Sequence, residues 1–148
     1  MHIPPPLIAA AVAVVMIGIH QLPLPDALRF SLPAAVHFGI GLLGIAVAVA
    51  GVAQFRRHQT TINPIKIDAA TTLVTNGVFR WSRNPMYLGM LVFLIAIGIK
   101  LGNMASLMSA TLFIPIVTTL QIKPEEAVMR RLFGAAFERY CQTTRRWL

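Results

Sequence analysis

The chain has 148 residues, of which 56% are hydrophobic and only 12% charged, and its mean hydropathy is +0.69. Charged residues make up about a quarter of an ordinary soluble domain, so this composition excludes one and predicts a single membrane domain, residues 1–148. The net charge of +8 does not indicate a nucleic-acid partner, because the basic residues flank apolar runs and the lipid bilayer is the expected partner.

Four apolar runs follow one another along the chain, and each is close to the roughly 17–25 residues of a transmembrane helix. We expect spans over residues 7–22, 34–53, 85–101 and 104–122. The first run has no Lys or Arg before it, unlike a secretory signal, so we expect it to stay in the membrane. The predicted fold class is therefore an all-α integral membrane protein with about four transmembrane helices.

Small and helix-breaking residues within the runs predict how they pack. Gly44 and Ala48 in the second run are four residues apart, so they share one helix face and allow close helix approach. Pro115 lies inside the fourth run and should kink it or free a carbonyl. The sequence leaves open whether this proline makes a simple packing kink or widens a cavity for substrate.

The distribution of positive charge predicts the orientation. With four spans, both termini and the loop 54–84 share one side, which holds 11 of the 13 Lys and Arg residues. Positive loops face the cytoplasm. We therefore expect both termini and this loop to be cytoplasmic, in the inner membrane of a bacterium.

The most polar part of the chain is the junction between this loop and the third run. Asn84 and Pro85 suit the cap and first position of a helix, while Arg80 and Arg83 could be ordinary interfacial anchors. Tyr87 follows within the first helical turn. Together these groups and the free N–H groups of a helix start form a potential anion site, which a ligand carboxylate would fit.

A pair of carboxylates follows the fourth run. Glu125 and Glu126 come directly after Pro124 and begin an amphipathic tail helix over residues 124–141. Helix-dipole stabilisation would explain one of them. They are expected at the same membrane face as the arginines, where they could bind an ammonium group or ribose hydroxyls, or pair with Arg80 or Arg83. Spacing alone does not separate pairing from ligand binding.

Several common kinds of site are not expected. The sequence has no P-loop, dinucleotide fingerprint, HExxH motif or serine elbow. Its one cysteine, Cys141, cannot form a disulfide within the chain, and we expect no metal site. An enzyme built from these residues would rely on binding and alignment.

The junction and the tail together resemble a known superfamily. Residues 73–80 and 83–89 resemble the first signature of the isoprenylcysteine carboxyl methyltransferases and phospholipid methyltransferases, Gly-Pro-Tyr-Arg-Tyr followed by Arg-His/Asn-Pro-x-Tyr-x-Gly. The second signature is similar to Glu125-Glu126, Leu132-Phe133-Gly134, Tyr140 and Arg146-Trp147. Asn84 stands where many members have histidine, so a histidine base is absent there, and Val78 stands where proline is common.

The resemblance implies an S-adenosylmethionine-dependent membrane methyltransferase, with S-adenosylhomocysteine as product and a lipidic or small hydrophobic acceptor. Its catalytic residues would be Arg83, Asn84 and Glu126. The loop 54–84 and the tail helix would hold the cofactor through Val74, Gly77, Phe79, Arg80, Arg83, Asn84, Pro85, Tyr87, Leu88, Glu125 and Glu126.

Three points stay open in the sequence. The acceptor atom could be a carboxylate oxygen, as in isoprenylcysteine, an amine nitrogen or a thiol. The oligomeric state is not indicated. A small non-catalytic membrane protein that assembles or anchors partners is the alternative function, which the packing glycines of the second run would suit.

Overall fold

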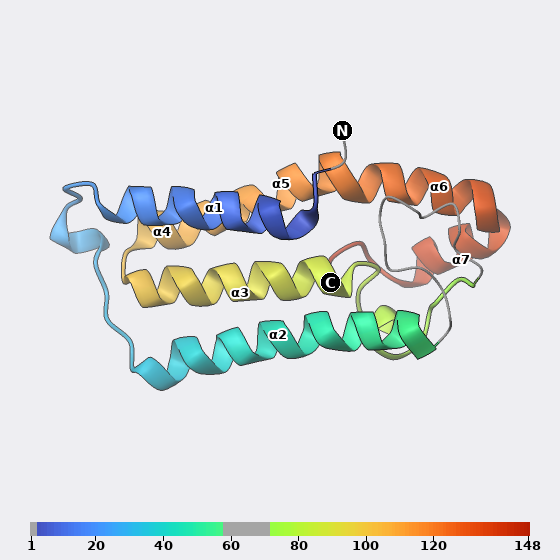
Figure 1. The fold of residues 1–148 in the computed structure, drawn as a ribbon, viewed down its shortest axis with the longest axis horizontal. Coiled ribbons are helices and arrows are strands. Elements are labelled where there is room, and N and C mark those ends of the chain that lie inside the picture. Colours follow the sequence, from blue (N-terminus) through green and yellow to red (C-terminus); the bar gives the residue numbers. More distant parts are fainter. Residues whose placement is uncertain (1–2, 58–71) are drawn as a thin grey trace.

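The computed structural model describes residues 3–57 and 72–148, and within these ranges it contains helices and no β-strand (Figure 1). The predicted all-α class is confirmed. The helices are α1 (Pro5–His20), α2 (Ala34–Arg57), α3 (Pro85–Leu101), α4 (Met104–Ser109), α5 (Phe113–Val117), α6 (Lys123–Phe133) and α7 (Ala135–Thr143). Short 3-10 turns cover Asp26–Leu28, Gly77–Arg80 and Ala110–Leu112, and a π-helix covers Thr118–Ile122.

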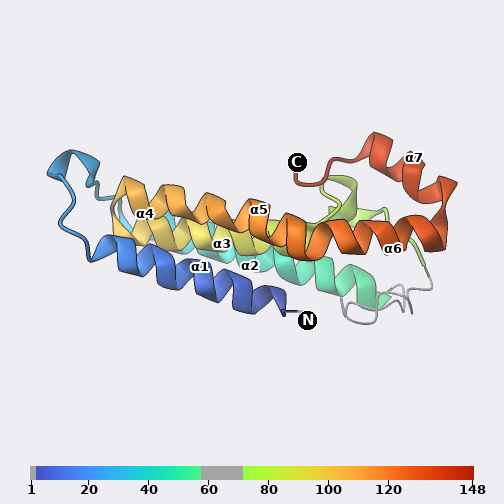
Figure 2. The same ribbon diagram turned by 90° about the horizontal axis from the view of Figure 1, so that it is seen from above.

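Helix α3 lies at the centre of an elongated bundle. It packs against α2 on one side and against α1 and α4 on the other (Figures 1 and 2). The main core lies between α1, α3 and the α4–α5 segment and includes the fully buried side chains of Met16, Leu94 and Phe113. Helices α6 and α7 extend beyond the bundle at the end where α3 begins.

The contact between α2 and α3 depends on two glycines. A Cβ atom on Gly44 would lie 2.7 Å from the Gly89 carbonyl oxygen, and one on Gly89 would lie 2.5 Å from the Gly44 carbonyl oxygen and 2.7 Å from the Ala48 nitrogen. These helices therefore approach through their backbones, which confirms the packing role predicted for Gly44 and Ala48. This contact fixes the position of the start of α3 on α2.

We expect Gly44→Ala to destabilise the protein by about 1–3 kcal/mol, because the added methyl group must push two backbones apart. Gly39→Ala is the matched control on the same helix, since a Cβ atom there has no neighbour within 4 Å. Alanine favours a helix over glycine by up to about 1 kcal/mol, so this control should be neutral or stabilising. The thermal midpoint of each variant in detergent measures both effects, and equal midpoints would contradict the packing role.

The helices match the four apolar runs closely. By length and composition, two are able to cross a membrane: Ala34–Arg57 and the nearly continuous helical stretch Met104–Phe133. Pro5–His20 and Pro85–Leu101 are apolar but shorter. The membrane character is therefore supported by two long helices, and the four-span arrangement stays a prediction.

The fourth run departs from regular α-helix around its proline. A 3-10 turn precedes Pro115, and a π-helix follows it at Thr118–Ile122. Proline has no N–H and cannot complete the regular hydrogen-bond ladder, which accounts for irregular geometry in this stretch. The hydroxyl of Thr118 is buried without a hydrogen-bond partner.

The prediction of one continuous tail helix over 124–141 is wrong. Gly134 ends α6 with φ 48° and ψ −124°, and α7 starts at Ala135. Glycine adopts this left-handed backbone region without a Cβ clash, so the chain breaks there and α7 folds back beside α6 (Figure 2). In the predicted loop 54–84, residues 54–57 continue α2, and residues 58–71 lie outside the described residues.

Candidate functional site

Two segments that are distant in the sequence meet where α3 begins. A small core holds them together, formed by Val74 and Phe79 before α3 and by Phe137 and Tyr140 on α7. The Tyr140 hydroxyl donates a buried hydrogen bond of 2.6 Å to the Phe79 carbonyl oxygen. The tail (residues 123–148) is thereby docked on the segment before and at the start of α3, which we call the junction (residues 76–89).

The end of the tail is bound to the junction through its backbone. The Arg83 N–H donates to the Arg145 carbonyl oxygen at 3.0 Å. The Arg146 carbonyl oxygen accepts from the Asn84 amide at 3.0 Å and from the Ser82 hydroxyl at 3.4 Å. These bonds hold the last residues of the chain next to the first turn of α3.

A buried carboxylate joins two arginines at this place. Glu126 is 5% exposed. It accepts a hydrogen bond from Arg83 Nη2 at 2.8 Å and a two-pronged contact from Arg146, with Nε to Oε1 at 2.9 Å and Nη2 to Oε2 at 2.7 Å. We call Arg83, Glu126 and Arg146 the charge cluster. It confirms the alternative in which Glu126 pairs with Arg83.

Arg83 also binds the tail directly. Its Nη1 donates to the carbonyl oxygens of Thr144 at 2.6 Å and Cys141 at 3.3 Å. Its Nε is buried and has no hydrogen-bond partner. Arg83 is therefore a bridge between the start of α3 and helices α6 and α7, and Nε is the guanidinium nitrogen without a partner.

The charge cluster keeps Glu126 ionised. Burial by itself would raise the pKa of Glu126, but hydrogen bonds from Arg146 and Arg83 outweigh burial and lower this pKa below its ordinary value. The same contact with Glu126 raises the pKa of Arg146. Glu126 is therefore an anion near neutral pH.

The second carboxylate has a different environment. Glu125 Oε1 accepts a hydrogen bond of 2.6 Å from the Tyr87 hydroxyl on α3. Burial raises the pKa of Glu125 to about 7, although the bond from Tyr87 lowers it, and the neighbouring Glu126 raises it further. Glu125 is therefore a carboxylate whose charge changes near neutral pH, and no Lys or Arg in the described part of the chain forms an ion pair with it.

The start of α3 differs from the expected cap. Asn84 occupies the cap position and Pro85 the first helical position, but the Asn84 side chain makes no capping hydrogen bond. Asn84 and Pro85 thus occupy the predicted positions, but the Asn84 side-chain oxygen does not cap the helix, and its Nδ2 donates to the Arg146 carbonyl oxygen. The first N–H groups of α3, at Met86 and Tyr87, therefore do not donate to this side chain.

The other predicted residues lie in different environments. Arg80 has an exposed side chain, so only Arg83 enters the cluster. Gly77 has φ 58° and packs against the Gln54 side chain, Pro85 is buried, and Leu88 is partly buried on α3. Val74 and Phe79 belong to the small core. No group of His, Cys, Asp and Glu residues in the described ranges could hold a metal ion.

The role of Arg146 could not be predicted from the sequence. The second signature includes it, but an arginine near a chain end has many possible partners. Only the fold shows that α7 returns the chain to Glu126. Ser82 and Thr144 were missed for the same reason, since both act through contacts between residues more than 60 positions apart.

Fold and site together define an all-helical protein with membrane-length apolar helices and a buried charge cluster at one end. The model of the family described as phospholipid methyltransferase matches residues 34–136, so the chain belongs to that family.

Curated proteins support the same superfamily. A probable protein-S-isoprenylcysteine O-methyltransferase of Oryza sativa subsp. indica is 29% identical over 101 residues, covering 68% of this chain and 53% of that protein. The protein-S-isoprenylcysteine O-methyltransferase of Schizosaccharomyces pombe is 26% identical over 111 residues, covering 75% and 47%. The chain spans about half the length of these relatives. An uncharacterized protein of Haemophilus influenzae is 38% identical over 63 residues, which are 43% of this chain and all of that protein.

Proposed function

We propose that this protein is a membrane methyltransferase that transfers a methyl group from S-adenosylmethionine to a lipidic or small hydrophobic acceptor. The observation that carries the proposal is the charge cluster, in which Glu126 joins Arg83 and Arg146 and so brings both family signatures to one place. The cluster lies at the end of an apolar helix bundle, where a polar cofactor and an apolar acceptor can meet.

The polar groups around the start of α3 fit the chemical parts of S-adenosylmethionine, which has a carboxylate, an ammonium group, a ribose diol and a sulfonium. The buried Nε of Arg83 lacks a partner, and together with the open N–H groups at the start of α3 it suits a carboxylate. Glu125 has one oxygen on Tyr87 and capacity for an ammonium group or a diol.

The same contacts favour a different role for each of the predicted catalytic residues. Both oxygens of Glu126 are taken by arginines, which favours a role in positioning Arg83. Asn84 holds the tail through the Arg146 carbonyl and, as an amide, supplies no base. We propose that Val74, Gly77, Phe79 and Leu88 shape the site around these groups, and that Arg80 acts at its exposed rim.

When bound, S-adenosylmethionine supplies a methyl group on a positively charged sulfur. The residues of this chain orient the reactants and exclude water, and positioning supplies much of the catalysis in such a displacement. A carboxylate acceptor needs no general base, in agreement with the absence of a histidine at position 84. The names of the family and the relatives favour a phospholipid amine or an isoprenylcysteine carboxylate as acceptor.

We propose four spans with both termini in the cytoplasm of a bacterium, which would place the charge cluster at the cytoplasmic face. In a Cys141→Ser background, we expect a cysteine at Ser31 to react with a membrane-impermeant maleimide in intact cells. A cysteine at Gln142 should react only after lysis. Both positions are exposed in the structure. The reverse labelling pattern would overturn the orientation.

The charge on Glu125 predicts a pH dependence of cofactor binding. Because its pKa is about 7, lowering the pH from about 8 to about 6 neutralises the carboxylate that would attract the ammonium group. We expect affinity for S-adenosylhomocysteine to fall by roughly tenfold over this range. In Glu125→Gln the affinity should be weak and change little with pH. Calorimetric titrations at each pH check this. If the affinity of Glu125→Gln fell with pH as much as that of the unaltered protein, Glu125 would not be part of the site.

The function itself is tested by transfer of radiolabelled methyl from S-adenosylmethionine. Membranes containing the protein should incorporate label into the organic extract, and membranes containing Glu125→Gln should incorporate much less. Mass spectrometry of the labelled products would then identify the acceptor atom. Absence of transfer to lipid extracts and prenylated peptides, together with absence of cofactor binding, would favour the alternative of a non-catalytic membrane protein.

A further inference from the structure

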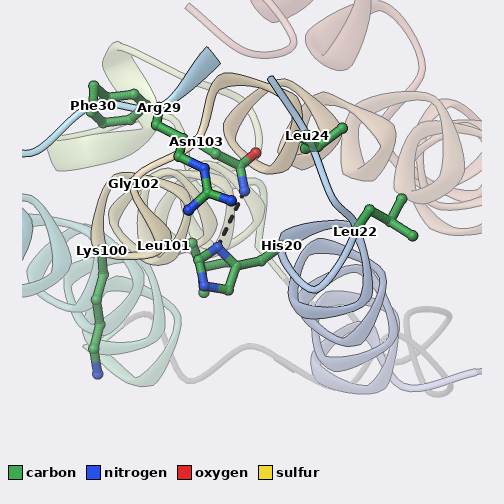
Figure 3. A pocket seen from close by; sticks show the side chains of 9 residues that line it. All are labelled: His20, Leu22, Leu24, Arg29, Phe30, Lys100, Leu101, Gly102 and Asn103. Carbon is green, nitrogen blue, oxygen red and sulfur yellow. Dashed lines mark hydrogen bonds between the residues drawn. The ribbon is translucent and has the colours of Figure 1, made fainter. Parts of the chain in front are cut away.

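A second polar site lies at the opposite end of α3 from the charge cluster. A cavity of about 290 Å³ opens where α1 ends, where α3 turns into α4, and under the proline-containing connection between α1 and α2 (Figure 3). Since α3 has 17 residues, the two sites are about 25 Å apart along this helix. The cavity is therefore separate from the proposed methyl-transfer site.

The floor of the cavity is fixed by a buried asparagine. Asn103 is 4% exposed. Its Oδ1 accepts a hydrogen bond from the Ser106 N–H at 2.7 Å, which assigns Nδ2 as the amide donor to His20 Nδ1 at 3.2 Å. Because Nδ1 of His20 accepts this bond, the ring carries its proton on Nε2. His20 therefore keeps one N–H donor for a ligand.

The connection above the cavity is also held in place. The Phe30 N–H donates to the Gly102 carbonyl oxygen at 2.9 Å, and Arg29 forms a backbone bridge with Asn103. Gly102 has φ 69°, and a Cβ atom there would lie 2.7 Å from the Phe30 carbonyl oxygen. The cavity thus has a defined wall that brings Arg29 over the end of α3.

The charge of the cavity is positive. Arg29 and Lys100 line it, and none of the described lining residues is acidic. Figure 3 shows the Arg29 guanidinium directed toward His20 and Asn103, whereas Lys100 extends away from them at the rim. Asp26 is the acidic residue that contacts Arg29, at 3.5 Å, and both side chains are largely exposed, so this pair is weak.

Apolar side chains complete the cavity: Leu22, Leu24, Phe30 and Leu101. A pocket of roughly 300 Å³ with apolar walls and a few convergent donors is of the size that takes a small ligand. The position at the ends of three apolar helices corresponds to the headgroup region in the proposed topology. His20 and Lys100 lie in the last turns of α1 and α3, where the helix dipole stabilises positive charge. Arg29 lies outside any α-helix, so the helix dipole does not account for its position.

We propose that this cavity binds a phosphate group, with Arg29 and the His20 Nε2–H as the principal donors and Lys100 at the rim. The phosphate is that of an anionic phospholipid or free inorganic phosphate. Neither the proposed methyl transfer nor its cofactor requires this site.

The test uses the full chain in detergent and native mass spectrometry with three separate probes: dioctanoyl phosphatidylglycerol, dioctanoylglycerol, which lacks phosphate, and inorganic phosphate. We expect phosphatidylglycerol to bind and Arg29→Gln to weaken that binding about tenfold. Arg57→Gln, an exposed arginine at the other end of the bundle, is the matched control and should bind as the unaltered protein does. Binding of S-adenosylhomocysteine should be the same in both variants.

Arg29-dependent binding of phosphatidylglycerol alone supports a lipid phosphate, and Arg29-dependent binding of inorganic phosphate supports a free anion. Equal weakening by Arg29→Gln and Arg57→Gln would show general attraction by positive charge and would overturn the site. So would equal binding of phosphatidylglycerol and dioctanoylglycerol, or binding of none of the three probes.

Discussion

Replacing Glu126 by glutamine is expected to release the tail from α3 and to destabilise the protein by roughly 3 kcal/mol. The carboxylate is almost fully buried and neutralises both Arg83 and Arg146. Removing one partner of a buried ion pair leaves uncompensated charge, which costs more than the pair itself contributes. Cofactor binding should weaken as well, by about 1–3 kcal/mol, because Arg83 loses the contact that orients it.

Glu138→Gln is the matched control for this change. Glu138 forms an ion pair with Arg130 at the same distance of 2.8 Å, but both side chains are about half exposed. An exposed pair contributes little to stability, so this variant should unfold nearly as the unaltered protein does. Denaturant unfolding in detergent measures both variants. Equal stability of the two would show that the cluster does not hold the tail.

Arg83→Lys is the second change with a large expected effect, although it keeps the positive charge. Arg83 reaches Glu126 through one terminal nitrogen and the carbonyl oxygens of Cys141 and Thr144 through the other. A lysine ammonium is a point donor and cannot span these acceptors in the same geometry. We expect a loss of about 2 kcal/mol in tail docking, seen as faster hydrogen exchange over residues 135–148.

Arg80→Lys decides between the two arginines that the sequence could not separate. Arg80 is exposed, so its replacement should change stability by less than about 0.5 kcal/mol. Hydrogen exchange of the tail should stay as in the unaltered protein. If Arg80→Lys loosened the tail and Arg83→Lys did not, the assignment of the cluster would be reversed.

The helices were predictable because apolar runs between prolines and glycines have few alternatives. The spacing of Gly44 and Ala48 predicted a packing face on α2. It did not predict that this face would contact Gly89 on α3. The break at Gly134 was not predicted, because a glycine inside an amphipathic pattern is tolerated in a helix and only its positive φ shows the turn.

The pairing within the site could be anticipated only as a set of alternatives. Opposite charges at one membrane face indicated that Glu125 or Glu126 could either pair with Arg80 or Arg83 or bind a ligand. The choice of Arg83 with Glu126 and of Tyr87 with Glu125 depends on the rotation of α6 relative to α3. This rotation depends on the π-helix Thr118–Ile122, which comes directly before α6 and changes the helical register there. Local spacing does not encode it, and the same holds for the return of Arg146.

Calorimetric titration of the detergent-solubilised full chain with S-adenosylhomocysteine tests the central claim most directly. We expect saturable binding with one ligand per chain, weakened by about 1–3 kcal/mol in both Glu125→Gln and Glu126→Gln and unchanged in Glu138→Gln. Folded protein that shows no saturable binding, or that binds with the same affinity in all three variants, would contradict a cofactor site at the meeting of α3 and the tail.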